Sequence, residues 1–183
     1  FTFGYKRGGN VSLLKKLGEE LKFTVHGLPA VTFDGQPVRS TRIREAIQAG
    51  DLDAASQMLG RPYSLASRVI RGYQLGRQLG FPTANLDVAG LALPPNGVYA
   101  AHATVVGQAT HQAVVNIGSR PTLQQPTPQL YVEAHLLDFK GDLYDKGLEV
   151  TFTGKLREET RFPSLESLKE QIARDIAQAR ARF

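Results

Sequence analysis

Cysteine and tryptophan are absent from the 183-residue sequence, and methionine occurs once. Without cysteine the chain can form no disulfide bond and use no thiol nucleophile, which is compatible with a cytoplasmic protein because disulfides are rare there. The sequence also has no run of about 18 apolar residues, so we expect no membrane-spanning helix. Hydrophobic residues still make up 42% of the chain, which is enough for a packed core.

The formal net charge is +5 at pH 7, which raises the question of a nucleic-acid partner. Apart from Lys6-Arg7 and the C-terminal arginines, the basic residues are scattered along the chain. This distribution is typical of a solvated surface with a few phosphate contacts rather than of a nucleic-acid-binding stripe. We therefore expect no nucleic-acid partner.

Residues 1–60 carry helical patterns around one short strand. Capping residues followed by apolar residues at helical spacing predict helices after Asn10, Ser40-Thr41 and Asp51. Apolar and polar residues alternate at 23–25, which predicts the strand. Because one strand cannot form a sheet, we interpret this half as the end of a doubly wound domain whose other strands lie upstream.

From Arg61 onward the hydrophobic period becomes that of strands. Short strands bounded by Gly, Pro or Asp are predicted at 65–71, 98–106, 112–117, 130–137 and 148–156. No helical pattern is visible between Arg61 and Arg161, so a closed antiparallel barrel is favoured over parallel βαβ units. A final helix capped by Ser164 is expected to pack on the barrel through an apolar stripe. The stripe consists of Leu165, Leu168, Ile172, Ile176 and Ala179.

The segment 71–85 contains three glycines and ends in Pro-Thr-Ala-Asn. Glycines allow backbone N–H groups to approach an anion closely. The Thr83 hydroxyl and the Asn85 amide carbonyl are hard oxygen donors that suit Mg²⁺. The segment matches neither a Walker A loop nor a dinucleotide fingerprint. A loop that can wrap phosphates, followed by two oxygen donors, nevertheless predicts a nucleoside-triphosphate site.

Phosphoryl transfer also needs a group that orients or deprotonates the acceptor hydroxyl. Glu133 lies in the predicted strand 130–137, on the face opposite its alternating apolar residues. A carboxylate in a largely apolar strand is unfavourable unless it is paired or functional. The pattern alone is equally compatible with a solvated carboxylate on the wet face of the barrel. His135 points the same way and is an alternative base.

Two further clusters are candidates for the site. Asn116 and Gly118 end a strand and open a loop, although a plain β-turn explains them equally well. The charged run 155–161 can place a cation or a flat guanidinium over an aromatic ligand. Within that run, we expect Glu158 and Glu159 to be solvated.

Six short strings occur along the chain: Leu59-Gly-Arg-Pro-Tyr63, Gly80-Phe-Pro-Thr-Ala-Asn85, Asn96-Gly-Val-Tyr99, Asn116-Ile-Gly-Ser-Arg-Pro-Thr122, Val132-Glu-Ala-His-Leu-Leu-Asp-Phe139 and Gly141-Asp-Leu-Tyr144. Through them, residues 61–183 resemble the riboflavin kinase module of the bacterial bifunctional riboflavin kinase/FAD synthetase. The resemblance implies a mainly β fold, a six-stranded antiparallel Greek-key barrel with a C-terminal helix. It also implies MgATP-dependent phosphorylation of the riboflavin 5′-hydroxyl, which yields FMN and ADP.

The resemblance also implies roles by position. Glu133 corresponds to the general base, and Thr83 and Asn85 correspond to ligands of Mg²⁺ and the ATP phosphates. The flap over the nucleotide corresponds to residues 72–80, and the residues that bind ATP correspond to Gly72, Gly76, Arg77, Gly80 and Pro82 as well as Thr83 and Asn85. The residues that help to hold the isoalloxazine ring correspond to Arg157, Arg161 and Phe162.

Residues 1–60 resemble the tail of the family's FMN adenylyltransferase domain, through Phe3-Gly4 and Ser40-Thr-Arg-Ile-Arg44. The family's His-x-Gly-His motif does not occur in this sequence. We therefore interpret the chain as a remnant of that domain at 1–60 and a kinase domain at 61–183. We expect adenylyltransferase activity in a longer parent protein but not in this chain. If residues 1–60 are only part of a domain, they are either partly disordered or associate with a second copy of the chain. The sequence does not predict the oligomeric state.

Alternatives to a riboflavin kinase stay open at this stage. One is a non-catalytic barrel that binds flavin or single-stranded nucleic acid. The spread of the aromatic residues along the chain argues against nucleic acid. Another is a kinase that acts on a different small molecule, since a fold does not fix a function.

Overall fold

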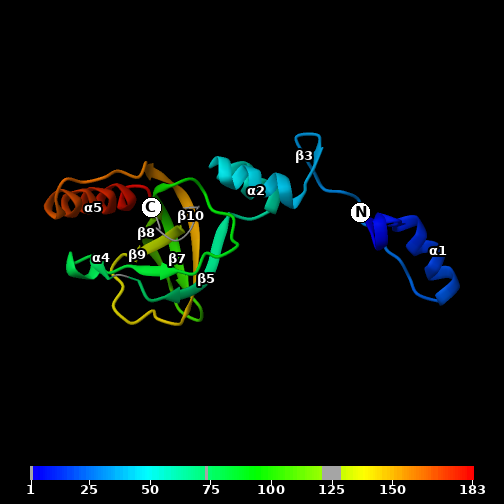
Figure 1. Ribbon diagram of the computed structural model, residues 1–183, viewed down its shortest axis with the longest axis horizontal. Coiled ribbons are helices and arrows are strands. Elements are labelled where there is room, and N and C mark those ends of the chain that lie inside the picture. The colour runs from blue at the N-terminus through cyan, green and yellow to red at the C-terminus, as the bar shows by residue number, and fades with distance from the viewer. Residues whose placement is uncertain (1, 73, 121–128) are drawn as a thin grey trace. The chain divides into compact units, whose positions relative to one another are not determined.

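The computed structural model describes residues 2–72, 74–120 and 129–183, and the chain divides into two compact units, 1–38 and 39–183 (Figure 1). The first unit contains β1 (Thr2–Phe3), η1 (Tyr5–Arg7), β2 (Gly9–Asn10), α1 (Val11–Leu21), β3 (Thr32–Phe33) and β4 (Gln36–Pro37). In this unit β1 pairs with β2, and β3 pairs with β4, both antiparallel. Among the described residues, none of the helices combines the length and hydrophobicity of a membrane-spanning segment.

The helix predicted after Asn10 is confirmed. The Asn10 side chain accepts a hydrogen bond of 2.9 Å from the Leu13 N–H, which satisfies one of the free N–H groups at the helix start. The strand predicted at 23–25 is wrong, because these residues form no ladder. Instead, the Phe23 N–H donates to the Gly18 carbonyl and closes the end of α1. Two alternating residues next to a helix end carry too little pattern to predict a strand.

The second unit begins with two short helices, α2 (Ser40–Ala49) and α3 (Leu52–Leu59). The α3 cap is confirmed, since Asp51 accepts a hydrogen bond from the Ala54 N–H. The α2 cap is one residue earlier than predicted, at Arg39, and has no side-chain hydrogen bond. Ile47 and Ala55 are buried in the same core as the barrel. This compact unit therefore begins upstream of the domain boundary at residue 60 that the sequence predicts.

Six antiparallel strands close into a barrel in the order β10-β5-β6-β9-β8-β7 (Figure 1). They are β5 (Ser64–Ile70), β6 (Ala84–Leu86), β7 (Gly97–Val105), β8 (Thr110–Arg120), β9 (Gln129–Leu136) and β10 (Gly147–Arg157). The mainly β fold class is thus confirmed. The hydrophobic pattern had given five of these strands and had missed β6, which has only three residues. It had also missed α4 (Leu75–Gln78), a four-residue helix too short to show a period.

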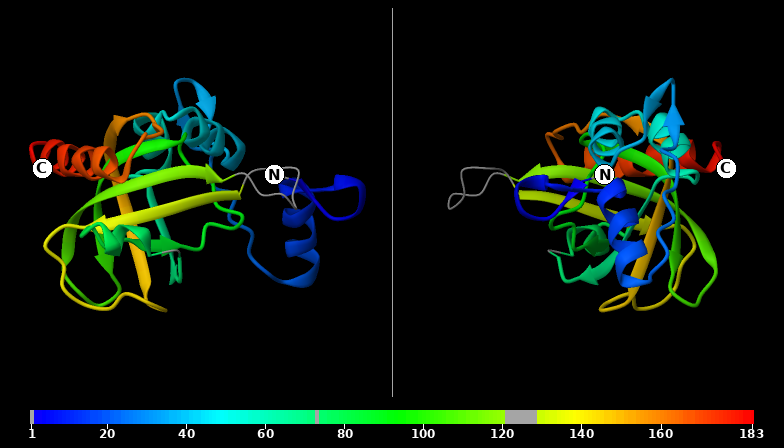
Figure 2. Two further views of the ribbon diagram at one scale, coloured as in Figure 1. Left: turned by 60° about the vertical axis from the view of Figure 1, so that its left-hand side comes forward. Right: turned by 90° about the vertical axis from the view of Figure 1, so that its right-hand side faces the viewer.

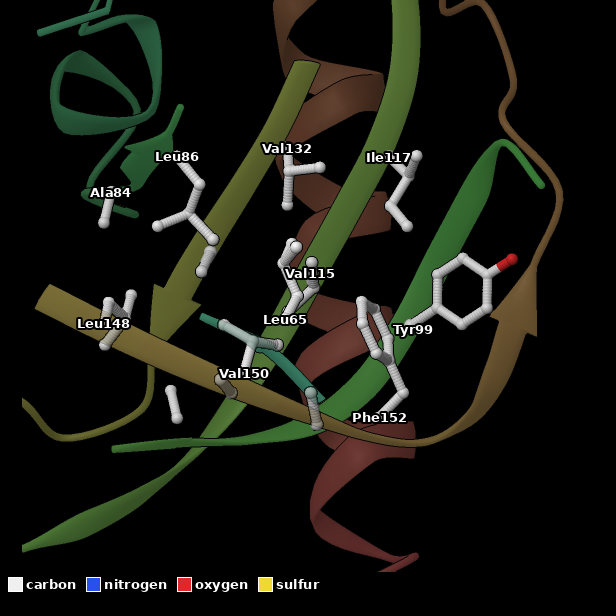
Figure 3. Packing of buried hydrophobic residues seen from close by; sticks show 14 of the residues in the cluster. Leu65, Ala84, Leu86, Tyr99, Val115, Ile117, Val132, Leu148, Val150 and Phe152 are labelled. Carbon is white, nitrogen blue, oxygen red and sulfur yellow. The ribbon is translucent and has the colours of Figure 1, made fainter. Parts of the chain in front are cut away.

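Alternation along the strands fills the barrel with apolar side chains (Figure 3). Leu65, Val115, Val132 and Val150 point inward from four different strands and are at most 3% exposed. At one side of this core, Phe152 lies edge-on to the Tyr99 ring and stacked with the Tyr63 ring. Close packing of this kind fixes which residue of each strand faces inward, and therefore which residue faces out.

The C-terminal helix α5 (Leu165–Arg180) lies on the outside of the barrel, against β7, β8 and β10 (Figure 2). The predicted cap is confirmed, because the Ser164 hydroxyl accepts a hydrogen bond from the Ser167 N–H. Ile176 and Ala179 pack on Val98 and other outward residues of the barrel. The predicted stripe is therefore only partly a packing surface, and its first member, Leu165, is 54% exposed.

A bidentate ion pair ties α5 to β10. Arg157 donates from Nε and Nη2 to the two Asp175 oxygens, each at 2.8 Å, and Gln171 donates to the same carboxylate at 2.8 Å. Asp175 is only 2% exposed. Removing one partner of a buried pair leaves the other charge desolvated and unpaired.

We therefore expect the Asp175→Asn substitution to lower the free energy of unfolding by about 3 kcal/mol. Denaturant unfolding followed by circular dichroism measures the change. Glu170→Gln in the same helix is the control. Glu170 is 71% exposed, and its ion pair with Arg174 is long, at 3.9 Å. Loss of such an exposed pair should change stability by less than about 0.5 kcal/mol. Equal effects of the two substitutions would contradict the importance of the pair.

Candidate active site

Strand register brings three predicted site residues into one row on the outer face of the barrel. Asn85 on β6 lies opposite Glu133 on β9, and Glu133 lies opposite Asn116 on β8. Directly opposed residues of antiparallel strands share a face of the sheet. The flanking residues Ala84 and Ala134 are buried in the barrel core, so the row faces outward.

A cavity of about 540 Å³ lies over part of this row. Its polar wall includes Thr83, Asn116 and Glu133. Its apolar wall is built from the segment around α4 and from the first half of α5. Among the apolar residues that line the cavity are Leu79, Phe81, Phe162, Leu168 and Ile172. Two members of the predicted α5 stripe therefore face this cavity rather than the barrel.

A smaller cavity of about 70 Å³ lies on the other side of Thr83. Thr83 lines both cavities, so the two spaces lie next to each other at this residue. The small cavity is also lined by Arg77, Pro82, Asp142 and Tyr144. The threonine of the Pro-Thr-Ala-Asn string is thus placed where two bound molecules can meet.

The predicted site residues are not all brought together. The large cavity is lined by Gly76, Thr83, Asn116, Glu133, Arg157 and Phe162. The small cavity is lined by Arg77, Pro82 and Thr83. Neither of these two cavities is lined by Gly72, Gly80, Asn85, Gly118 or Arg161. The end of the predicted string 116–122, from Pro121 on, lies outside the described residues.

The glycines of the 71–85 segment are required sterically. A Cβ on Gly72 would overlap the amide group of Asn85, and a Cβ on Gly76 would overlap the Phe81 carbonyl oxygen. Gly80 has a φ of +89°, in the left-handed region that disfavours other residues. Gly72 therefore packs directly against Asn85 of β6, and the lack of a side chain at this position leaves room for the Asn85 amide.

His135 holds the same segment from the barrel side. Its Nδ1 lies 2.8 Å from the Pro82 carbonyl oxygen, and its ring lies edge-on to the Phe81 ring at 5.9 Å. A carbonyl only accepts hydrogen bonds, so Nδ1 carries the proton in this contact. The residue that sequence reasoning treated as an alternative base thus fixes the backbone next to Thr83.

The end of the cavity near α5 contains Arg157, whose guanidinium lies 5.6 Å from the centre of the Phe162 ring. The prediction that Glu158 is solvated is confirmed, since its side chain is 79% exposed and pairs with Lys155. The interpretation of Glu159 was incomplete. Although exposed, Glu159 lines the cavity and accepts a hydrogen bond of 3.0 Å from the Tyr131 hydroxyl.

Sequence reasoning missed both Tyr131 and Glu159 as members of the site. Burial raises the pKa of the Tyr131 hydroxyl, and the hydrogen bond to the Glu159 carboxylate raises it further. The hydroxyl therefore stays protonated at neutral pH and can donate to Glu159. The only sequence signal was the position of Tyr131, two residues from Glu133 on the same strand face.

Thr83 and Asn85 fit a magnesium ion that is shared with phosphates. They flank the inward-pointing Ala84, so both project toward the outer face. Among the described residues, no group of three or more His, Asp or Glu side chains could hold a metal ion. Mg²⁺ usually takes few protein oxygens and completes its shell with phosphate oxygens and water. Two neutral oxygen donors beside a glycine-rich loop match that type of site.

The family model of riboflavin kinases, the flavokinase domain, matches residues 59–183. The chain belongs to the riboflavin kinase family. A bifunctional riboflavin kinase/FMN adenylyltransferase of Pseudomonas fluorescens is 46% identical over 181 residues, which cover 99% of this chain and 58% of the relative. The protein of the same description from Escherichia coli K12 is 40% identical over the whole chain and 58% of its own length. The chain thus spans less than two thirds of these relatives.

A solved structure shares the fold. It is a Streptococcus pneumoniae protein described as a macrolide-efflux protein, with a TM-score of 0.76 and 28% identity. The match covers 98% of this chain and 57% of the other. The description of that protein says nothing about flavin, so the likeness supports the fold alone.

We expect Gly72→Ala to weaken the use of MgATP several-fold, because the new Cβ would displace the Asn85 amide. Titrations of ATP and of Mg²⁺ at saturating riboflavin measure the effect. Gly8→Ala is the control, since its Cβ would have only an ordinary contact of 3.6 Å. Unchanged titrations in a folded Gly72→Ala protein would show that the Asn85 amide is not needed in its present position.

Proposed function

We propose that this chain transfers the terminal phosphoryl group of ATP to the 5′-hydroxyl of riboflavin, giving FMN and ADP. The observation that carries the proposal is the placement of Glu133. Its carboxylate lines the same cavity as Thr83, and Thr83 also borders the second cavity. The carboxylate that can act as a base therefore lines the large cavity together with Thr83, the residue that the two cavities share.

The large cavity suits the flavin. Phe81, Phe162, Leu168 and Ile172 give it apolar walls, which match a flat aromatic ring system. Arg157 is held rigidly by Asp175, so its guanidinium is available as a fixed planar surface beside the ring. Arg161, which lines neither cavity, has no support from the geometry for the role that the resemblance implies.

The glycine-rich segment and the small cavity suit the nucleotide. Backbone N–H groups near Gly72, Gly76 and Gly80 can approach phosphate oxygens closely. Arg77 lines the small cavity and supplies a positive charge for the phosphates. With the nucleotide on this side and flavin on the other, the transferred group passes close to Thr83.

In the proposed mechanism, the Glu133 carboxylate accepts a hydrogen bond from the riboflavin hydroxyl and takes its proton as the oxygen attacks phosphorus. Thr83 and Asn85 are the residues that would hold Mg²⁺, which would offset the charge that develops on the phosphate oxygens. The apolar walls and the folded 71–85 segment exclude water and so limit hydrolysis of ATP. His135 keeps the Pro82 carbonyl, and with it Thr83, in place.

The names of the relatives include a second activity, FMN adenylyltransferase. We propose that a longer parent protein converts FMN to FAD and that residues 1–60 are the end of the domain that does so. The lack of a His-x-Gly-His motif leads us to expect no such activity in this chain. A cytoplasmic location agrees with the cellular role of such an enzyme.

Incubation of the chain with MgATP and riboflavin, followed by chromatographic separation of the flavins, tests the function directly. FMN without FAD is the expected product. Riboflavin binding without any FMN would instead support the non-catalytic flavin-binding alternative. FAD formation would contradict the assignment of residues 1–60 as an inactive remnant.

We expect Glu133→Gln to lower kcat by about 10²–10⁴-fold, the usual contribution of a general base. The amide keeps the shape of the side chain but cannot take a proton, so nucleotide binding should persist. Steady-state kinetics and ATP-analogue binding are measured together. Glu149→Gln is the control, because Glu149 is also a barrel-strand carboxylate but contacts Ser64 and lines neither cavity. A Glu133→Gln variant with the parent kcat would rule out the assignment.

We expect Asn85→Ala to raise the Mg²⁺ concentration needed for half-maximal rate several-fold and to leave riboflavin affinity unchanged. The reason is that one neutral oxygen ligand is lost while the large cavity keeps its walls. Gln112→Ala removes an amide from another barrel strand outside both cavities and serves as the control. If the Mg²⁺ dependence of Asn85→Ala followed that of the control, Asn85 would have no part in metal binding.

A further inference from the structure

The segment directly after β10, residues 158–162, contacts Lys155 and Arg157 at the end of that strand, and the Glu159 carboxylate joins it to other parts of the barrel. The Tyr131 hydroxyl donates to Glu159 Oε1 at 3.0 Å, and the Asn96 amide donates to Glu159 Oε2 at 3.2 Å. Each carboxylate oxygen therefore has its own donor. The donors lie 28 and 63 residues away in the sequence, so the contact joins distant parts of the chain.

Both donors are themselves held in place. The Asn116 amide donates to the Tyr131 hydroxyl at 3.3 Å, and the Asn96 amide also donates to the Ser119 hydroxyl at 3.2 Å. The five side chains form one connected network that spans β8, β9 and the residue before β7. Other hydrogen bonds already orient the hydroxyl and amide donors. Little conformational entropy of these donors is therefore lost when they bind the Glu159 carboxylate.

Gly118 leaves room for this contact. A Cβ at this position would overlap both Glu159 Oε1 and the Tyr131 hydroxyl. The backbone φ of Gly118 is not in the left-handed region, so the glycine is required for space and not for its conformation. The sequence singled out Gly118 as a turn or site residue, and the structure gives it a different task.

We propose that Glu159 is a positioning residue for the flavin end of the large cavity. This inference rests on the proposed function. By fastening the 158–162 segment to Tyr131 and Asn96, Glu159 holds Thr160 and Phe162 at the cavity wall, where both residues lie. Without the carboxylate, the segment must be ordered when riboflavin binds, which weakens binding. The small cavity, which we assign to the nucleotide, is lined by none of the five residues of this network.

The first test compares Glu159→Ala with Glu158→Ala. The two substitutions remove the same charge at adjacent positions, but Glu158 is exposed, pairs with the neighbouring Lys155 and does not line the cavity. Quenching of riboflavin fluorescence gives the dissociation constant without nucleotide, and steady-state kinetics give the KM for ATP. We expect Glu159→Ala to weaken riboflavin binding about tenfold, as for the loss of a charge-assisted hydrogen bond, and to change the KM for ATP less than twofold.

The second test uses Tyr131→Phe, which removes a single oxygen atom. We expect it to weaken riboflavin binding about threefold. The double variant should bind riboflavin no more weakly than Glu159→Ala alone, because both changes break the same contact. Additive losses in the double variant would overturn the proposal. Since Tyr131→Phe keeps the ring and its packing, it can be measured even if Glu159→Ala does not fold, and unchanged riboflavin binding in Tyr131→Phe would then overturn the proposal.

Three further outcomes separate this inference from the proposed function. If the parent chain converts riboflavin to FMN but Glu159→Ala and Glu158→Ala bind riboflavin equally well, only the role of Glu159 is refuted. The same holds if Glu159→Ala weakens ATP and riboflavin to the same extent, which indicates a general structural defect. If the parent chain neither binds nor phosphorylates riboflavin, the proposed function is refuted, and the inference with it.

Discussion

The pairing register of β6, β9 and β8 is the constraint on which the rest of the site depends. Apolar side chains on the inner faces of these strands, such as Val132 and Val115, are fully buried and fix the register. A shift of one residue would turn every side chain to the other face. Glu133 would then enter the core, and Asn85 and Asn116 would no longer lie beside it. The same packing that stabilises the barrel thus assembles the row of polar side chains on its outer face.

Secondary elements with two different faces connect the core to the site. Strand β7 is buried on both sides, with Tyr99 in the barrel core and Val98 under α5. Helix α5 packs on the barrel with its second half and lines the cavity with Leu168 and Ile172 from its first half. The Arg157–Asp175 pair lies between these regions. A change that loosens α5 is therefore expected to affect both stability and the shape of the cavity.

Long segments with alternating apolar and polar residues made most of the barrel strands and part of the site predictable from the sequence. The alternation around Glu133 gave its outward orientation, and the oxygen donors after the glycines gave the neighbourhood of Thr83 and Asn85. Strand β6 and helix α4 were not predicted, because segments of three or four residues are too short to show a hydrophobic period. The role of Glu159 was not predicted for another reason. Its partners Tyr131 and Asn96 are distant in the sequence, and only the closed barrel brings them together. The false strand at 23–25 shows the converse error, in which a short alternation was taken as a ladder.

The central claim is that Glu133, Thr83 and Asn85 serve one reaction on the outer face of the barrel. A crystal structure of this chain with riboflavin and MgADP tests it most directly. The account predicts the riboflavin 5′-hydroxyl within about 2.6–3.2 Å of the Glu133 carboxylate. It also predicts the magnesium ion on the Thr83 and Asn85 oxygens, at about 2.0–2.1 Å. A flavin bound elsewhere, or a hydroxyl turned away from Glu133 with the metal held by other residues, would contradict the account.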